Sequence, residues 1–250
     1  NEVENTTNVS LTLWDVVGNT YDYLDTTTLP NSGKFSFTFW YCPSQARNNS
    51  AYLFYGDSSN YLRMNISSYN YPNLQLKLNN NWNNVYGTQG SEGGNVTNWA
   101  DGVYKWKCYT CTFDPVLGNV KIFTNGEKVA DYTNANAQYD FVAQHSGAIR
   151  MTLPANNSGS YGRVDNIALY DDVLTDAEAI AVQGGAGTDT VGRSVNLASL
   201  SGSSSKLVDY WKIQGDTGTN NYLTGVVNSK KLNVGGAVGG ISQFMSTIRP

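Results

Sequence analysis

The sequence has few of the residues on which disulfide-stabilised, metal-binding and catalytic proteins depend. Its 250 residues include three cysteines, one histidine and five glutamates. Three cysteines are too few for a disulfide framework. The single histidine, His145, cannot by itself build a zinc site or a catalytic triad. The low numbers of these residues favour a binding or structural role over a catalytic one.

Charge and long apolar runs are also scarce. Charged residues make up 14% of the chain, against about 25% in typical proteins. The net charge is −4 and no run of basic residues occurs, which argues against a nucleic-acid partner. No apolar stretch approaches the ~20 residues that span a bilayer, so membrane insertion is not predicted.

Two of the cysteines have the C-x-x-C spacing of redox and zinc sites. Cys108 and Cys111 lie inside a strand-like run from Val103 to Phe113, where residues three apart point to opposite faces. The sequence has no second pair of cysteines or histidines to complete a zinc site. We therefore predict that both cysteines are small buried hydrophobic residues.

The glutamates do not form the pattern of a glycoside hydrolase. Retaining hydrolysis needs two carboxyl groups ~5–5.5 Å apart, a spacing that same-face positions of a strand supply. Glu2 and Glu4 have that spacing, but in a polar terminus without strand alternation, and the others are isolated. We predict that the protein is not an enzyme. A hydrolase whose acidic pair is assembled by folding stays open as a third alternative.

The residues that are abundant favour β-structure. The stretch Phe35–Tyr41 alternates strictly, with Phe35, Phe37 and Phe39 on one face and Trp40 on the other. Asn125-Gly126 is a strong hairpin signal, whereas Asn79–Asn84 is expected to form a loop. Further strands are predicted at 51–55, 61–66, 73–78, 103–113, 120–124, 127–132, 147–153 and 161–170.

One helix is predicted late in the chain. Thr175 and Glu178 form a capping box, and Gly184-Gly185 ends the helix. Many strands, short turns and one short helix indicate an all-β fold class. We predict a two-sheet antiparallel jelly-roll sandwich with one short helix and a C-terminal extension.

The composition changes after Gly185. We predict a sandwich over residues 1–185, a Gly/Ser-rich linker over 186–205, and an extension over 206–250 that packs on the sandwich or on a partner subunit. Leu207–Ile213 is apolar on both faces and must be covered. The sequence therefore predicts a homo-oligomer or particle-bound array, and a chain ending at Gly185 that still folds.

Three stretches carry a family resemblance. They are F-S-F-T-F-W (Phe35–Trp40), the segment Trp99–Asp114 with the V-K-I-F-T-N-G-E-K-V-A that follows, and Arg163–Ile180. In this order they resemble the concanavalin A-like, laminin-G-like superfamily. The resemblance implies calcium as a cofactor, with Asp165 as a ligand. In the alternative interpretation, Asp165 caps a β-bulge or pairs with Arg163 or Arg193.

The tail has a narrower resemblance. Asn196–Gly202 and Leu207–Thr219 are similar to the ending of virion-associated lectin-like proteins of marine bacteriophages. The resemblance implies a phage virion structural protein at the virion surface, such as a capsid decoration, head-fibre or tail-associated protein. Its partners would be other virion proteins or copies of itself.

The alternative function is carbohydrate binding. A lectin or adhesin outside the cell would recognise a cell-surface polysaccharide, stacking sugars on aromatic rings and bonding hydroxyls through amides. Two segments, Tyr69–Asn73 and Asn79–Tyr86, combine these residue types. The candidate glycan-binding residues are Tyr71, Trp82, Asn83 and Tyr86.

Overall fold

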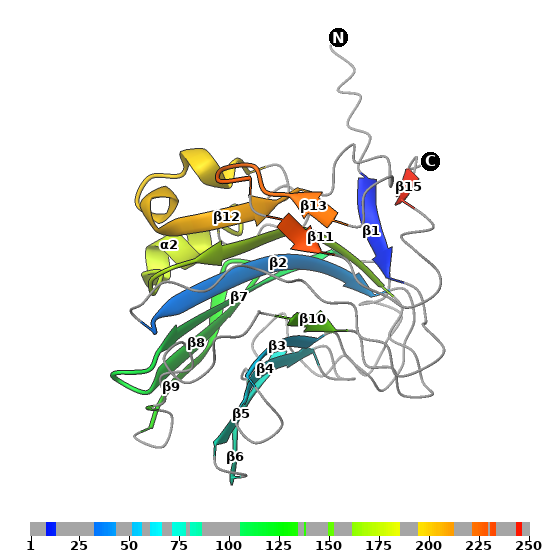
Figure 1. Ribbon diagram of the computed structural model, residues 1–250. Helices are drawn as coiled ribbons and strands as arrows, with labels where there is room; N and C mark the ends of the chain where they lie inside the picture. The colour runs from blue at the N-terminus through cyan, green and yellow to red at the C-terminus, as the bar shows by residue number, and fades with distance from the viewer. Residues whose placement is uncertain are drawn as a thin grey trace.

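The described part of the chain forms two antiparallel β-sheets stacked face to face, with one α-helix on the outer face of the larger sheet (Figure 1). In this computed structural model the backbone is described for residues 9–13, 33–43, 52–56, 61–66, 72–78, 81–86, 106–134, 138, 150–152, 162–185, 195–212, 222–229, 231–233 and 244–246. Side chains are described for residues 33–40, 106–134, 138, 166–185, 195–212 and 224–229.

The larger sheet has the strand order β15-β1-β11-β2-β7-β8-β9, and β12 pairs with β11 beyond the end of β1. The turn between β8 and β9 contains Asn125 and Gly126, both with positive φ (48° and 81°), which confirms the predicted hairpin. The strands are β1 (Val9–Leu13), β2 (Phe35–Pro43), β7 (Lys107–Asp114), β8 (Asn119–Thr124), β9 (Glu127–Thr133), β11 (Gly162–Tyr170), β12 (Leu207–Trp211) and β15 (Phe244–Ser246).

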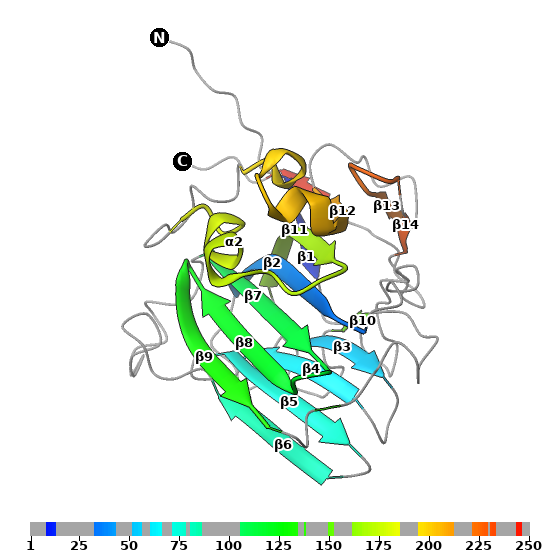
Figure 2. The same ribbon diagram turned by 90° about the vertical axis from the view of Figure 1, so that its left-hand side faces the viewer.

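The smaller sheet has the order β10-β3-β4-β5-β6, and its edge strand β6 lies beside β9 of the larger sheet (Figure 2). Strand β6 covers most of the segment expected to be an Asn-rich loop, so that expectation is wrong. Pairing with β5 satisfies the backbone there and overrides a weak local preference. The strands are β3 (Tyr52–Gly56), β4 (Tyr61–Ile66), β5 (Pro72–Leu78), β6 (Asn81–Tyr86) and β10 (Arg150–Thr152), with a separate pair β13 (Tyr222–Thr224) and β14 (Lys231–Asn233).

Aromatic residues of β2 fill the space on both of its faces. Phe35, Phe37 and Phe39 are stacked along one face, and the ring of Phe39 lies 5.7 Å from that of Tyr109 on β7. On the opposite face Trp40 is also buried. The predicted register is confirmed, and both faces of this strand are covered.

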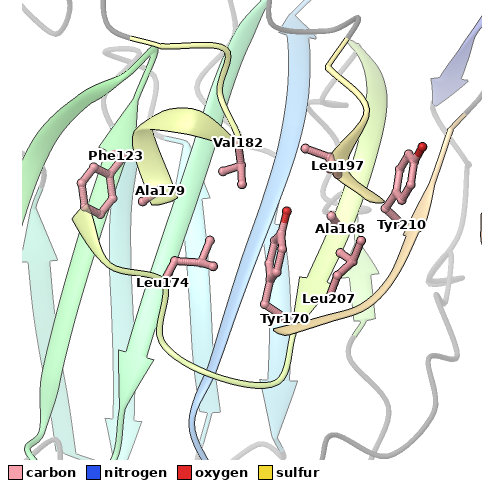
Figure 3. Packing of buried hydrophobic residues seen from close by; sticks show 9 residues of the cluster. All are labelled: Phe123, Ala168, Tyr170, Leu174, Ala179, Val182, Leu197, Leu207 and Tyr210. Atoms are coloured by element: carbon pink, nitrogen blue, oxygen red, sulfur yellow. The ribbon is translucent and has the colours of Figure 1, made fainter. Parts of the chain in front are cut away.

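A second apolar cluster lies between the larger sheet and the elements on its outer face (Figure 3). These elements are α2 (Asp176–Ala181), η4 (Leu197–Ser199) and η5 (Ser203–Lys206). The capping box of α2 is present, with the Glu178 amide donating to Thr175 Oγ1 at 3.2 Å and the Thr175 amide to Glu178 Oε2 at 2.8 Å. The cluster contains Phe123, Ala168, Tyr170, Leu174, Ala179, Val182, Leu197, Leu207 and Tyr210.

Buried hydrogen bonds connect the end of α2 to the sheet. Gln183 is fully buried, and its Nε2 donates to Thr110 Oγ1 at 2.6 Å and to the Phe123 carbonyl at 3.2 Å. Its Oε1 accepts from the Gly126 amide in the hairpin turn. Because a buried amide group is costly without partners, these bonds determine where the helix sits.

The described residues 195–212 pack on the sandwich, and part of the predicted linker has regular structure. Residues 195–205, expected in a linker, form η4 and most of η5, with Leu197 and Ser203 buried. Strand β12 joins the larger sheet beside β11, and its Trp211 is 1% exposed. The linker prediction is therefore wrong for these residues. Of the two predicted alternatives for the extension, packing on the sandwich or on a partner subunit, residues 207–212 show packing on the sandwich.

A buried carboxylate attaches a further turn of the tail to β12. Asp209 is fully buried, and its oxygens accept from the amides of Val227 (2.9 Å) and Asn228 (3.2 Å). The Val226 amide donates to the Tyr210 carbonyl at 2.9 Å. A Cβ on Gly225 would lie 2.0 Å from Asp209 Oδ2, so this close approach requires glycine.

Candidate functional site

The pairing register separates the smaller sheet into two faces of different chemistry. Alternate residues of a strand share a face, and the pairs Leu62↔Leu76 and Met64↔Leu74 are typical of one face. This composition is the one that a sandwich packs against its other sheet. The apolar face holds Leu53, Tyr55, Leu62, Met64, Ile66, Pro72, Leu74, Leu76, Leu78, Val85 and Met151, together with Asn81 and Asn83 of the edge strand β6.

The other face combines aromatic, amide and basic residues in three rows that run across the strands. We call it the polar–aromatic face. Rows of a sheet are separated by about 4.8 Å from strand to strand, so neighbouring residues are close enough to contact one ligand. The rows are Arg150–Phe54–Arg63–Gln75–Asn84, then Thr152–Tyr52–Asn65–Asn73–Tyr86, and then Gly56–Tyr61–Lys77–Trp82.

The arrangement of the layers leaves room on one side of the smaller sheet. In Figure 1 the larger sheet covers one side, and no described helix or strand lies over the other. Burying the apolar face between the sheets would put the polar–aromatic face on that uncovered side. Aromatic residues beside amides are what sugar sites use, because rings stack on apolar sugar faces and amides bond hydroxyls.

The structure brings together only part of the glycan-binding set predicted from sequence. Trp82 and Tyr86 share the polar–aromatic face. Asn83 lies on the apolar face, in register with Leu76, because adjacent residues of a strand alternate. Tyr71 lies outside the described residues.

Several residues of this face were missed by sequence reasoning. Arg63 and Gln75 lie on β4 and β5, whose alternation was visible in the sequence. The missing information was the pairing, which also brings Arg150 of β10 next to Phe54. Pairing between segments so far apart in the chain has no local signal.

The residue implied as a calcium ligand lies at an irregularity of β11. Asp165 pairs with Trp40, and the register shifts directly after it, where Asn166 has a positive φ of 46°. The side chain of Asp165 is outside the described side chains. Among the residues whose side chains are described, no group of three His, Cys, Asp or Glu is placed to hold a metal ion.

The two cysteines of β7 are buried, and strand alternation puts them on opposite faces, as predicted. Burial raises the pKa of the Cys108 thiol to about 12 and raises the pKa of the Cys111 thiol as well. Because the thiolate is the reactive form, both groups are inert at neutral pH. The C-x-x-C spacing therefore marks core residues.

The acidic side chains of α2 make structural contacts. Glu178 caps the helix and pairs with Lys206 at 2.7 Å. Hydrogen bonds from Lys121 and Lys128 hold the pKa of Asp176 below its usual value. A general acid for glycoside cleavage needs a raised pKa instead.

The helices of the described segments are all too short to cross a membrane.

Comparison with known families gives the same fold. Residues 18–180 match the family model of the concanavalin A-like lectin/glucanases superfamily. The chain belongs to this superfamily. That membership confirms the all-β jelly-roll prediction, and with it the resemblance of the segments from Phe35 to Ile180. No curated protein sequence matches this chain.

Solved structures with the same fold include a protein from Bacteroides ovatus ATCC 8483 whose assignment as a carbohydrate binding protein is provisional. It is 14% identical with a TM-score of 0.57, and the match covers 91% of this chain and 58% of that one. The CBM40 of the Ruminococcus gnavus IT-sialidase is 15% identical (TM-score 0.47; 70% and 96% covered). A heptameric SAP-like pentraxin from Limulus polyphemus is 16% identical (TM-score 0.48; 71% and 82% covered). This chain therefore spans little more than half of the Bacteroides protein, and the likeness concerns the fold.

Proposed function

We propose that this protein is a non-catalytic, lectin-like module that binds a polysaccharide on the polar–aromatic face. The observation that carries the proposal is the register of the smaller sheet, which collects Tyr61, Trp82 and Tyr86 with amide residues on one face. The superfamily supports it, since its members include lectins. The rows extend across four or five strands at about 4.8 Å per strand, which is longer than one sugar ring. A surface of this length suits a polymer better than a single sugar.

The same strands give no support to hydrolysis. The described strands of the smaller sheet, β3 to β6 and β10, contain no Asp or Glu. A retaining mechanism needs two carboxyl groups ~5–5.5 Å apart beside the bound sugar. A ligand on these strands would be held without being cleaved, and incubation with the bound polysaccharide should release no reducing ends.

The test of binding is a polysaccharide array followed by calorimetry on Trp82→Ala. Loss of one stacking ring should weaken binding about tenfold while the melting temperature stays near that of the parent. Tyr132→Ala is a matched control, because Tyr132 is a half-buried aromatic residue on β9 of the other sheet. Binding that is unchanged in Trp82→Ala, or absent from the whole array, would contradict the proposal.

Calcium at Asp165 is a second part of the proposal. The bulge after Asp165 turns the strand and redirects its backbone, and carboxylate, amide and carbonyl oxygens suit a hard cation. Millimolar calcium should raise the melting temperature relative to excess chelator, and Asp165→Ala should remove the difference. Identical melts in calcium and chelator would show that no site exists.

A phage virion component is a second candidate function. Its support is the resemblance of residues 196–219, of which 196–212 pack against the larger sheet or pair with it. A lectin-like face and a place on the virion surface are compatible. Mass spectrometry of purified particles should detect the chain in fixed proportion to the capsid protein. If the chain is absent from washed particles, the virion role is contradicted, and an extracellular lectin or adhesin remains as the proposed function.

A further inference from the structure

We infer that the ligand of the polar–aromatic face is an anionic polysaccharide, carrying carboxylate or sulfate groups. The inference rests on the proposed function and names the ligand class. Its basis is the placement of charge in the smaller sheet. Arg63, Lys77 and Arg150 are the only charged residues in the described strands β3 to β6 and β10, and all three share that face.

Burial explains part of this pattern and leaves the sign of the charge unexplained. Charged residues are excluded from an apolar face, so any charge in these strands belongs on the other face. That rule applies equally to acidic and basic residues. The whole chain has 20 acidic and 16 basic residues, yet these five strands carry three basic residues and none that is acidic. The described strands therefore contribute net positive charge to this face of a negatively charged chain, and such charge attracts an anionic ligand.

The basic residues alternate with aromatic residues across the sheet. Arg150 and Arg63 occupy one row on either side of Phe54, so their Cα atoms are roughly 10 Å apart, two strand spacings. Lys77 lies between Tyr61 and Trp82 in another row. Guanidinium groups match carboxylate and sulfate oxygens in a bidentate geometry, while the rings stack on the sugars. An acidic sugar polymer offers both features at every repeat.

Single-stranded nucleic acid also combines negative charge with stacking. A nucleic-acid ligand is disfavoured because proteins that bind single strands place many basic residues along the path of the phosphate backbone. The described strands of this face have three basic residues, on a chain of net charge −4. The same ligand chemistry could come from uronic acids or from sulfated sugars. The experiment below separates these sources.

The test compares charged polymers with uncharged polymers of the same sugar backbone. The full-length protein is titrated with polygalacturonate and its methyl ester, and with dextran sulfate and dextran. At least one charged form should bind about ten- to a hundredfold more tightly than its neutral counterpart, and the affinity should fall as salt rises. Preference within the carboxylated or the sulfated pair identifies the source of the anion. Equal binding to both members of each pair overturns the inference and leaves the proposed function standing, whereas no binding to any polysaccharide overturns both.

Charge-removing variants locate the effect. Arg63→Gln, Lys77→Gln and Arg150→Gln should each weaken binding to the charged polymer and reduce its salt dependence, with circular dichroism confirming the fold. Lys128→Gln is the matched control, because this exposed lysine lies on β9 of the other sheet. Trp82→Ala should weaken binding to charged and neutral forms alike. Loss of binding in the control but not in the three variants, or tighter binding to poly-dT than to either charged polysaccharide, would contradict the inference.

Discussion

Phe37 shows how much stability one residue contributes to this sandwich. Its side chain is 3% exposed, and its ring stacks on that of Phe39 with 6.4 Å between the centroids. Phe37→Ala should lower the free energy of unfolding by about 3–5 kcal/mol, because it removes a buried ring and leaves a cavity. Urea denaturation measures the change. A decrease in the free energy of unfolding below about 1 kcal/mol would mean that neighbouring side chains fill the cavity or that water reaches this face of β2.

Asp209 shows how a buried polar residue positions a segment of the tail. Its carboxylate accepts from the amides of Val227 and Asn228, and Asn at this position would turn an NH₂ group towards one of these donors. Asp209→Asn should cost about 2 kcal/mol. Hydrogen exchange should show the amides of Val227 and Asn228 losing protection while the amides of β8 keep theirs. Unchanged protection of these two amides would contradict the hydrogen bonding described.

At the scale of single elements, α2 depends on its contacts with the sheet. A helix of six residues is far below the length that is stable alone, so its cap, its ion pairs and Gln183 hold it in place. Thr175→Ala should cost about 1 kcal/mol, since it removes the acceptor of the Glu178 amide. Thermal melts against the exposed-site variant Val116→Ala provide the measurement. Equal melting temperatures would show that the cap contributes nothing.

The ion pairs of α2 predict a pH dependence. Hydrogen bonds from Lys121 and Lys128 lower the pKa of Asp176 in the folded state, so their contribution is present above the unfolded pKa and is lost as pH falls through the folded value. The carboxylate is 43% exposed, which limits the contribution to about 1 kcal/mol or less. The stability difference between the parent and Asp176→Asn should shrink below about pH 4 and in high salt. A difference that is constant from pH 7 to pH 2 would contradict this.

At the scale of the whole molecule, the tail belongs to the main sheet. Removing everything after Gly185 would delete β12, η4 and η5, and uncover Ala168, Tyr170 and the edge of β11. Such a chain should bind hydrophobic dyes and lose its cooperative melt, contrary to the expectation from sequence that it stays folded. A chain ending at Asn233 keeps these contacts and serves as the control. A cooperative melt of the shorter chain near the parent temperature would show that the tail is dispensable.

Local pattern by itself determined the elements whose chemistry is contained in a few neighbouring residues. The alternation of Phe35–Tyr41 identified a core strand, Asn125-Gly126 a hairpin, and Thr175 with Glu178 a helix start. Each depends on backbone preferences or on interactions within about four residues. The same alternation indicates which residues of one strand share a face.

Tertiary structure decided everything that depends on which strands meet. Pairing of β4, β5 and β6 separated Trp82 from Asn83, and added Arg63, Gln75 and Arg150 to the face that Trp82 occupies. Pairing of β12 with β11 made a strand of the main sheet from a segment that looked like an appendage. The physical reason is that an alternating strand presents the same two faces to any neighbour. The choice among neighbours comes from burial and hydrogen bonding summed over the assembled sandwich, a quantity that no short segment contains.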